Sequence, residues 1–368
     1  MGSWLRQLGA IPEWISTNIP PDAFNLRATL NSGQAFRWVE ISKSLEFVGL
    51  IGDRVWRLRQ TSVDTPVAFY GGCATVAELE MFFTRGQLPL PLVSYFRLDT
   101  HLDDLLSTWL DQDHLLRKFF SSSRAQDINR FKGLRLLNQD PRETIFAFIT
   151  SANNNIPRIS KLLIALSARY GTKMWSHETV SVYTFPTLEA LARPAIEVDL
   201  RKIGFGYRAK FIPAVARKLI EVGGDLFLSK LRVSSYEECK RFLLDLPGIG
   251  NKVADCICLS CLDKVEVVPV DVHISRAAAL RGVRPPAVCS SSLSSTAYRH
   301  ISQGLSNLWH PFAGWAQVIV FSIHIHGQSS GTERVSTKSK TKKEAANSRA
   351  APSASNVPTS RRKRTKHA

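Results

Sequence analysis

The sequence predicts an α+β fold, in which an antiparallel β domain comes first and packs on a larger helical domain. Residues 14–96 contain short stretches of alternating apolar and polar residues between glycine turns, the pattern of antiparallel strands. From about residue 102 the apolar residues recur instead at helical spacing, between helix caps. With 368 residues and 44% hydrophobic content, the chain is long enough to bury a core in both domains.

Four segments are expected on this basis. A short N-terminal extension takes residues 1–13, and the antiparallel β domain takes residues 14–101. The helical domain covers residues 102–326 and includes a helix–hairpin–helix unit at 235–262. A basic tail covers residues 327–368.

Two stretches carry the β prediction. AFRWVE at residues 35–40 and VWRLRQ at residues 55–60 alternate apolar and polar side chains. IGD at residues 51–53 and YGGCA at residues 70–74 are typical of turns. We therefore expect short strands joined by tight turns.

Capping residues place the first long helices. QDPRETIFAFITSA predicts a helix with Asp140 as its N-cap and Pro141 at its first position. Asn155 is expected to cap the next helix, which ends at Gly171. The apolar residues of that helix fall on one face: Ile159, Leu162, Leu163 and Leu166.

The charge of the chain is strongly positive and unevenly placed. Lys and Arg number 48 against 31 Asp and Glu, a net charge of +17. The tail from Gly327 to Ala368 holds 11 basic and 2 acidic residues, so it carries +9 and leaves +8 for the other 326 residues. This balance favours a polyanionic partner, most simply nucleic acid. A solvated basic surface would explain the charge equally well.

The tail itself contains few large apolar residues, so we expect it to be disordered. It ends in the basic cluster SRRKRTKHA, which is interpreted as a nuclear-import signal in preference to a nonspecific DNA-binding tail. The expected location is therefore the nucleus, with a mitochondrial pool left open.

Six cysteines are too few for a disulfide scaffold, and a reducing compartment is expected. Cys256, Cys258 and Cys261 lie on one helix but on more than one face, and no further His or Cys pair completes a metal site. They are interpreted as buried apolar residues, and neither a metal nor a cofactor is expected. No apolar run approaches the ~20 residues that span a bilayer, so no membrane association is expected.

The stretch LPGIGNK forms the expected hairpin between two helices, the first of which begins with a capping box of Ser235 and Glu238. Gly248 and Gly250 allow a tight turn. The N–H groups near Gly248, Gly250 and Val253 would then point outward at the positive end of a helix dipole, where they suit a phosphate. A plain glycine-rich connector remains the alternative.

Lys252 adds chemistry to this hairpin. The helix dipole and an apolar surround both disfavour its charged form, so we expect a lowered pKa and a larger fraction of the neutral, nucleophilic amine. Cys256 stands one turn further along the same face and could line the same pocket. Asp271 and His273 follow in VVPVDVHISR.

These stretches resemble the helix–hairpin–helix/Gly-Pro-Asp superfamily of DNA glycosylases, and within it the 8-oxoguanine DNA glycosylase family. The resemblance covers roughly residues 14–325. It rests on LPGIGNKVADCICL with VVPVDVHI, and on NSGQAFRW, LLNQDPRETIFAFITSANNNIPRI, IGFGYRAKF and FAGWAQVIVF, in the family's order. It implies a TATA-binding-protein-like β domain and a helical glycosylase domain. The implied function is that of a bifunctional DNA glycosylase and abasic-site lyase, acting as a monomer on damaged double-stranded DNA.

The resemblance also implies roles for single residues. Lys252 would attack the sugar and form a Schiff base, Asp271 would be the essential carboxylate, and His273 would lie beside a phosphate. The chemistry agrees, because a carboxylate stabilises the positive charge that develops on the sugar as the base departs.

The base pocket is expected to combine Gly33, Cys256, Gln317 and Phe321. Gln317 and Phe321 lie four apart in FAGWAQVIVFSIHI, a predicted helix at residues 312–325, so an amide and a ring can converge on one flipped base. Core packing is the alternative for this pair. The family uses its matching glycine carbonyl to attract the N7 hydrogen of 8-oxoguanine, which guanine lacks.

Further matching residues would fill the gap left by the flipped base and contact the unpaired cytosine: Asn153, Asn154, Arg158, Tyr207 and Arg208. Helix caps and a solvated arginine remain alternatives for the asparagines and Arg158. Two residues depart from the family pattern: His324 stands where an acidic residue is expected, and Ser260 where a bulkier pocket residue is common.

Two other functions stay open. A glycosylase for another damaged purine would usually rely on the aspartate alone, so Lys252 argues against it. A non-catalytic helix–hairpin–helix DNA-binding protein needs neither Lys252 nor Asp271.

Overall fold

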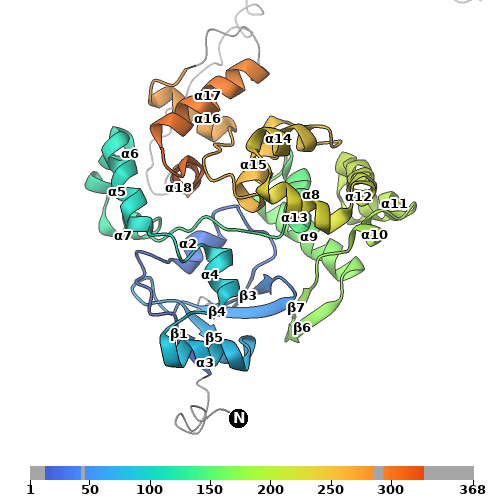
Figure 1. Ribbon diagram of the computed structural model, residues 1–368, viewed down its shortest axis with the longest axis horizontal. Coiled ribbons are helices and arrows are strands. Elements are labelled where there is room, and N and C mark those ends of the chain that lie inside the picture. The colour runs from blue at the N-terminus through green and yellow to red at the C-terminus, as the bar shows by residue number, and fades with distance from the viewer. Residues whose placement is uncertain (1–12, 43–45, 285–292, 327–368) are drawn as a thin grey trace, which may run out of the picture. The chain divides into compact units, whose positions relative to one another are not determined.

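The computed structural model describes residues 13–42, 46–284 and 293–326. The basic tail, residues 1–12 of the expected N-terminal extension and Cys289 lie outside the described residues. Within them, an antiparallel sheet precedes a predominantly helical region, as the sequence predicts (Figure 1).

The N-terminal sheet has five antiparallel strands in the order β1-β5-β4-β3-β2. The strands are β1 (Trp14–Ser16), β2 (Val39–Ser42), β3 (Glu46–Ile51), β4 (Arg54–Arg59) and β5 (Ala68–Tyr70). Gly52, at a φ of 59°, lies in the two-residue turn between β3 and β4. Three helices that the sequence analysis did not predict accompany the sheet: α2 (Leu26–Leu30), α3 (Val76–Arg85) and α4 (Leu90–Phe96). Trp56, Phe69 and Phe96 are among the fully buried side chains of their shared core.

The stretch AFRWVE is mostly not a strand, contrary to the expectation, since β2 takes only its last two residues. The side chains of this stretch contact both domains. Phe36 packs in a core of the helical domain, Arg37 forms an ion pair with Glu143, and the Trp38 indole donates to the Tyr95 hydroxyl at 2.9 Å. The apolar and polar residues of this stretch alternate because its side chains contact two domains, and not because the stretch is a strand with one buried face.

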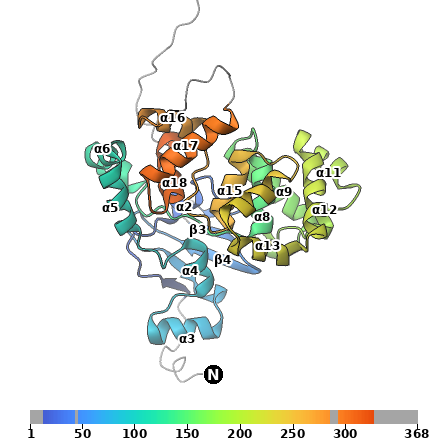
Figure 2. The ribbon, with the colours of Figure 1, turned by 45° about the horizontal axis from the view of Figure 1, so that its top comes forward.

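The helices of the second domain are seen in Figures 1 and 2, and they are built on two hydrophobic cores. The helices are α5 (Leu102–Gln112), α6 (His114–Ser122), α7 (Ala125–Asn129), α8 (Pro141–Ser151), α9 (Ile156–Tyr170), α10 (Leu188–Leu191), α11 (Ile196–Ile203), α12 (Phe211–Glu221), α13 (Gly224–Val233), α14 (Tyr236–Leu244), α15 (Asn251–Cys261), α16 (Val272–Leu280), α17 (Ser295–Leu308) and α18 (Ala313–His326). A hairpin of β6 (Lys173–His177) and β7 (Val180–Tyr183) follows α9. One core joins α8–α15, and the other joins α5 and α6 to α16–α18. Helix α15 lies between them and contributes to both, with Ile257 in the first and Leu259 in the second.

The predicted caps are confirmed. Asp140 accepts from the N–H of Glu143 at the start of α8, and Asn155 caps α9, which ends at Gly171. Ser235 forms the predicted capping box at α14. Among the described residues, no helix is both long enough and apolar enough to span a membrane.

Candidate active site

The hairpin between α14 and α15 exposes unused backbone N–H groups. Gly248 has a φ of 86°, and a Cβ there would come within 2.6 Å of the Phe211 ring, so only glycine fits. Gly250 is the N-cap of α15 and supplies no side-chain cap. Within the part of the chain that the structure describes, the amides of Gly248, Gly250 and Val253 donate no hydrogen bond. They are available to an anion at the positive end of the helix dipole.

Lys252 lies in the first turn of α15, half-buried, with Nζ 5.6 Å from the centroid of the Phe148 ring. The thiol of Cys256 lies one turn along the same helix. Burial lowers the pKa of Lys252, but the opposing influences of Cys256 and of the Asp271 carboxylate outweigh it, and the net shift is upward. Burial also raises the pKa of the Cys256 thiol, so we take the Asp271 charge to be the lasting cause near neutral pH.

The expected lowering of the Lys252 pKa is therefore wrong. The helix dipole and the apolar surround, on which that expectation rested, are both local to α15. Asp271 raises the pKa instead, and the fold brings it from 19 positions further along the chain. In the free protein Lys252 is held as an ammonium group, and it must lose a proton before it can act as a nucleophile.

Asp271 has a structural task as well as a charge. It is the N-cap of α16, and its Oδ1 accepts from the N–H groups of His273 and Ile274 at 2.9 Å each. Its Oδ2 receives no hydrogen bond from any residue in the described ranges. One oxygen therefore fixes the side chain, and the other is left with its lone pairs free beside Lys252.

A buried polar network joins α15, the helix of Lys252, to the residue before Asp271, and the sequence analysis missed it. Asp255, fully buried on α15, accepts from Lys240 and Tyr236 at 2.8 Å each through Oδ1. Its Oδ2 accepts from the Tyr298 hydroxyl at 2.6 Å. That hydroxyl in turn accepts from the N–H of Val270 at 3.2 Å, next to Asp271. A signal was available, because Asp255 is the only acidic residue in the apolar stretch VADCICLSC.

The base-pocket candidates converge from both domains. A Cβ on Gly33, which has a φ of 85°, would lie 3.6 Å from Cε1 of Phe321 and 3.0 Å from Cδ1 of Ile156. Gly33 lies between α2 and β2 and Phe321 is on α18, so the fold brings together residues almost 300 positions apart. The Gly33 carbonyl accepts no hydrogen bond from the residues described.

The remaining pocket residues lie beside this pair. Gln317 is buried one turn before Phe321 on α18, and its amide makes no hydrogen bond within the described part of the chain. The His273 ring meets Phe321 edge-on, with centroids 6.0 Å apart. Cys256 is buried beside Lys252, whereas Cys258 and Cys261 are buried in the core of α8–α15, as expected of apolar residues. The site thus offers a free carbonyl, a free amide and an aromatic ring beside a lysine and a carboxylate.

The candidates for contact with the opposite strand surround the turn between α8 and α9. Asn153 takes a positive φ of 49° in this turn. The Asn154 amide donates to the carbonyl of Thr150 at 3.0 Å, and the Arg158 guanidinium donates to that of Gly204 at 3.1 Å. The two side chains thus hold helix ends in this structure.

Tyr207 and Arg208 face the same turn but differ in exposure. The Tyr207 ring is 48% exposed, and its hydroxyl donates to the carbonyl of Ala152 at 3.2 Å. Arg208 is only 3% exposed and donates to the carbonyls of Ala152 and Asn153, the latter at 2.7 Å. The buried Arg208 side chain therefore stabilises the turn through its hydrogen bonds, whereas the Tyr207 side chain beside the turn is exposed to solvent.

The two departures from the family pattern have structural outcomes. His324 hydrogen-bonds through Nδ1 with the Val320 carbonyl of its own helix at 3.0 Å. The ring contact of His273 is with Phe321 and not with His324. Ser260 is buried, and its carbonyl accepts from the N–H of Gln139 at 2.9 Å.

Comparisons with known proteins agree with this geometry. The family model described as "8-oxoguanine DNA glycosylase, N-terminal domain" matches residues 16–145, and that for "HhH-GPD superfamily base excision DNA repair protein" matches residues 146–285. The N-glycosylase/DNA lyase of Saccharomyces cerevisiae is 33% identical over 83% of this chain and 85% of its own. That of Arabidopsis thaliana is 30% identical over 86% and 82%. The crystal structure of the 8-oxoguanine glycosylase/lyase of Clostridium acetobutylicum, in complex with DNA containing cytosine opposite 8-oxoguanine, is similar with a TM-score of 0.67 at 25% identity, covering 84% of this chain and 94% of that one.

Proposed function

The chain belongs to the 8-oxoguanine DNA glycosylase family of the HhH-GPD superfamily, and we propose that it excises 8-oxoguanine and related oxidised purines opposite cytosine, then cleaves the strand at the abasic site. One observation carries the proposal. Lys252 and Asp271 interact electrostatically, and the Gly33 carbonyl and the Gln317 amide, both near Phe321, have no partner among the described residues. A DNA-binding protein without catalysis needs none of these four groups.

Lys252 and Asp271 divide the chemistry between them. After losing a proton, the amine of Lys252 attacks C1′ of the sugar, the bond from C1′ to the base breaks, and the departing base takes up a proton. The Asp271 carboxylate, whose Oδ2 receives no hydrogen bond from the described residues, stabilises the positive charge that develops on the sugar as that bond breaks. The lysine nitrogen is then bonded to C1′, and the sugar ring opens as the C1′–O4′ bond breaks, the nitrogen loses a proton and O4′ takes one up, which gives the Schiff base. The Schiff base permits loss of the C2′ proton and of the 3′ phosphate, which cleaves the strand.

The pocket distinguishes 8-oxoguanine from guanine by the hydrogen-bond donors and acceptors of the base. The Gly33 carbonyl accepts from N7–H of 8-oxoguanine but faces a lone pair on N7 of guanine. The Gln317 amide donates to and accepts from the Watson–Crick edge, and Phe321 stacks on the ring. Cys256 closes the lysine side of the pocket.

The rest of the DNA is held by backbone and side-chain groups outside the pocket. The amides of Gly248, Gly250 and Val253, together with His273, contact phosphates on the damaged strand. The exposed Tyr207 side chain fills the gap left by the flipped base, and the turn at Asn153 and Asn154, with Arg158 beside it and Arg208 supporting it, faces the unpaired cytosine. We propose that the protein acts as a monomer in the nucleus, and that the domain limits follow the four segments predicted from the sequence.

The proposed function is tested with duplex DNA that carries 8-oxoguanine opposite cytosine, in the presence of borohydride. We expect a covalent protein–DNA adduct, because reduction fixes the Schiff base on Lys252. Base release without an adduct would show that Lys252 is not the nucleophile. Tight binding with neither base release nor adduct would favour a non-catalytic DNA-binding protein. Excision of another damaged purine in preference to 8-oxoguanine would favour a glycosylase for that purine.

A further inference from the structure

The turn that carries Gly33 is held from behind by the side chain of Gln34. This amide is buried, and both of its polar atoms are engaged. Its Nε2 donates to Ser32 Oγ at 2.8 Å and to the carbonyl of Arg135 at 3.0 Å, and its Oε1 accepts from the N–H of Leu137 at 3.0 Å. Gln34 therefore fixes the residue on either side of Gly33 against a segment 100 positions away.

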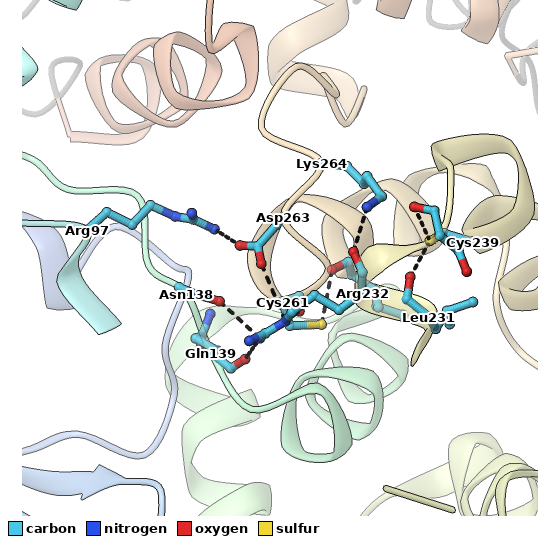
Figure 3. Close-up of polar contacts among 11 residues, drawn as sticks. Arg97, Asn138, Gln139, Leu231, Arg232, Cys239, Cys261, Asp263 and Lys264 are labelled. Atoms are coloured by element: carbon cyan, nitrogen blue, oxygen red, sulfur yellow. Dashed lines mark hydrogen bonds and ion pairs between the residues drawn. The ribbon is translucent and has the colours of Figure 1, made fainter. Parts of the chain in front are cut away.

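Gln139 connects the same turn to the catalytic helix. Its Nε2 donates to the carbonyl of Gln34 at 3.0 Å, and its own N–H donates to the carbonyl of Ser260 on α15 at 2.9 Å. Its carbonyl accepts from the Arg232 guanidinium at 3.1 Å, and Figure 3 shows Gln139 and Asn138 facing that group. A chain of hydrogen bonds thus runs from the Gly33 turn to the helix that holds Lys252.

We propose that Gln34 and Gln139 are positioning residues for lesion recognition, which set the place of the Gly33 carbonyl relative to α15 and so the discrimination between 8-oxoguanine and guanine. The inference rests on the proposed function. Discrimination by one carbonyl depends steeply on the distance and direction to N7. A glycine at a φ of 85° has no side chain to restrict rotation of its peptide, so neighbouring contacts must fix it.

This role predicts a split between two activities of one protein. Excision of 8-oxoguanine needs both the Gly33 carbonyl and Lys252. Cleavage at an abasic site that is already present needs Lys252 and Asp271 but no base reading, because no base remains. Loss of the Gln34–Gln139 contact should therefore damage the first activity and spare the second, which a general loss of stability would not do.

The test compares Gln139→Met with Gln60→Met. Methionine matches glutamine in length but cannot donate, so Gln139→Met removes only the bond to Gln34. Gln60 is another buried amide of the β domain, which joins Leu26 and Thr65 and makes no hydrogen bond to residues 32–34 or to Gln139, and it serves as the control. Single-turnover excision of 8-oxoguanine opposite cytosine and cleavage of an abasic duplex are measured on each preparation and compared as a ratio, so that any unfolded fraction cancels.

We expect the ratio of excision to abasic cleavage to fall by on the order of tenfold to 100-fold in Gln139→Met, as for small misplacements of a reacting pair, and to stay at the wild-type value in Gln60→Met. Gln34→Met, at the other end of the bridge, should show the same split. An unchanged ratio in both bridge variants, or an equal fall in Gln60→Met, overturns the proposal. Failure of the unaltered protein to excise 8-oxoguanine would instead overturn the proposed function, and the inference with it.

Discussion

Asp271 caps helix α16 and also supplies a negative charge at the candidate site, and two substitutions separate these two roles. Asp271→Asn keeps an oxygen that can accept from His273 and Ile274, and asparagine is as good an N-cap as aspartate. Asp271→Ala removes both hydrogen bonds and should cost about 1 kcal/mol of the free energy of unfolding, within a range of about 0.5–2. Asp271→Asn should cost only the charge–dipole part, about 0.3–1 kcal/mol.

The two variants should be alike in chemistry. Both lose the negative charge beside the sugar, which is typically worth ~3–4 kcal/mol, so single-turnover excision of 8-oxoguanine should fall by on the order of 10²–10³ in each. Affinity for the lesion should change little, because the ground state carries no positive charge on the sugar.

The assay pairs thermal unfolding with single-turnover excision and equilibrium binding on one 8-oxoguanine duplex. Asp271→Asn should unfold near the wild-type temperature, and Asp271→Ala at a lower one, while both excise slowly. Near-normal excision in Asp271→Asn, together with a loss of binding, would show that Asp271 acts as a helix cap alone and that the electrostatic reasoning is wrong.

Four further predictions follow from the site. Because the Asp271 charge raises the pKa of Lys252, Asp271→Asn should lower that pKa and shift the pH dependence of borohydride trapping on abasic DNA to lower pH; a shift to higher pH would contradict the assignment. Lys252→Gln should bind the lesion duplex but neither release the base nor form a trapped adduct, and trapping at the wild-type rate would exclude Lys252 as the nucleophile. Tyr298→Phe leaves Oδ2 of Asp255 and the Val270 N–H without a partner and should cost about 1–3 kcal/mol in denaturant unfolding, whereas Tyr170→Phe, which loses one bond to Asp199 nearer the surface, should cost less. Removal of the tail after Gly327 takes away a charge of +9, so the salt dependence of DNA binding should become shallower while excision at low salt persists; an inactive but folded truncation would show that the domain end is misplaced.

The sequence predicted those features that depend on neighbouring residues. The caps at Asp140, Asn155 and Ser235 are each decided within four positions, and all three are found. The order of an antiparallel sheet followed by helices is also confirmed. The stretch AFRWVE failed because its alternation serves contacts to two domains, which no local pattern reveals.

The candidate site was predictable in its residues but not in its electrostatics. Lys252, Asp271, Gly33 and Phe321 were named from motifs, and the fold brings them together in two pairs. The predicted direction of the Lys252 pKa shift was wrong, because the shift depends on Asp271. The bridge of Gln34 and Gln139 was missed for the same reason, since its bonds join residues about 100 positions apart.

The hydrogen-bond network around Asp255 also limits which amino-acid substitutions this protein can accept. Lys240 and Asp255 form a buried ion pair, and loss of either partner leaves the other charge buried and uncompensated. Tyr236, on the same helix as Lys240, and Tyr298, on α17, also donate to the Asp255 carboxylate. Single substitutions at these four positions should therefore be strongly deleterious, whereas a joint replacement by apolar residues of matching volume can be tolerated. In a mutational library, these positions should covary as a group, and a route that alters them one at a time should pass through unfolded intermediates.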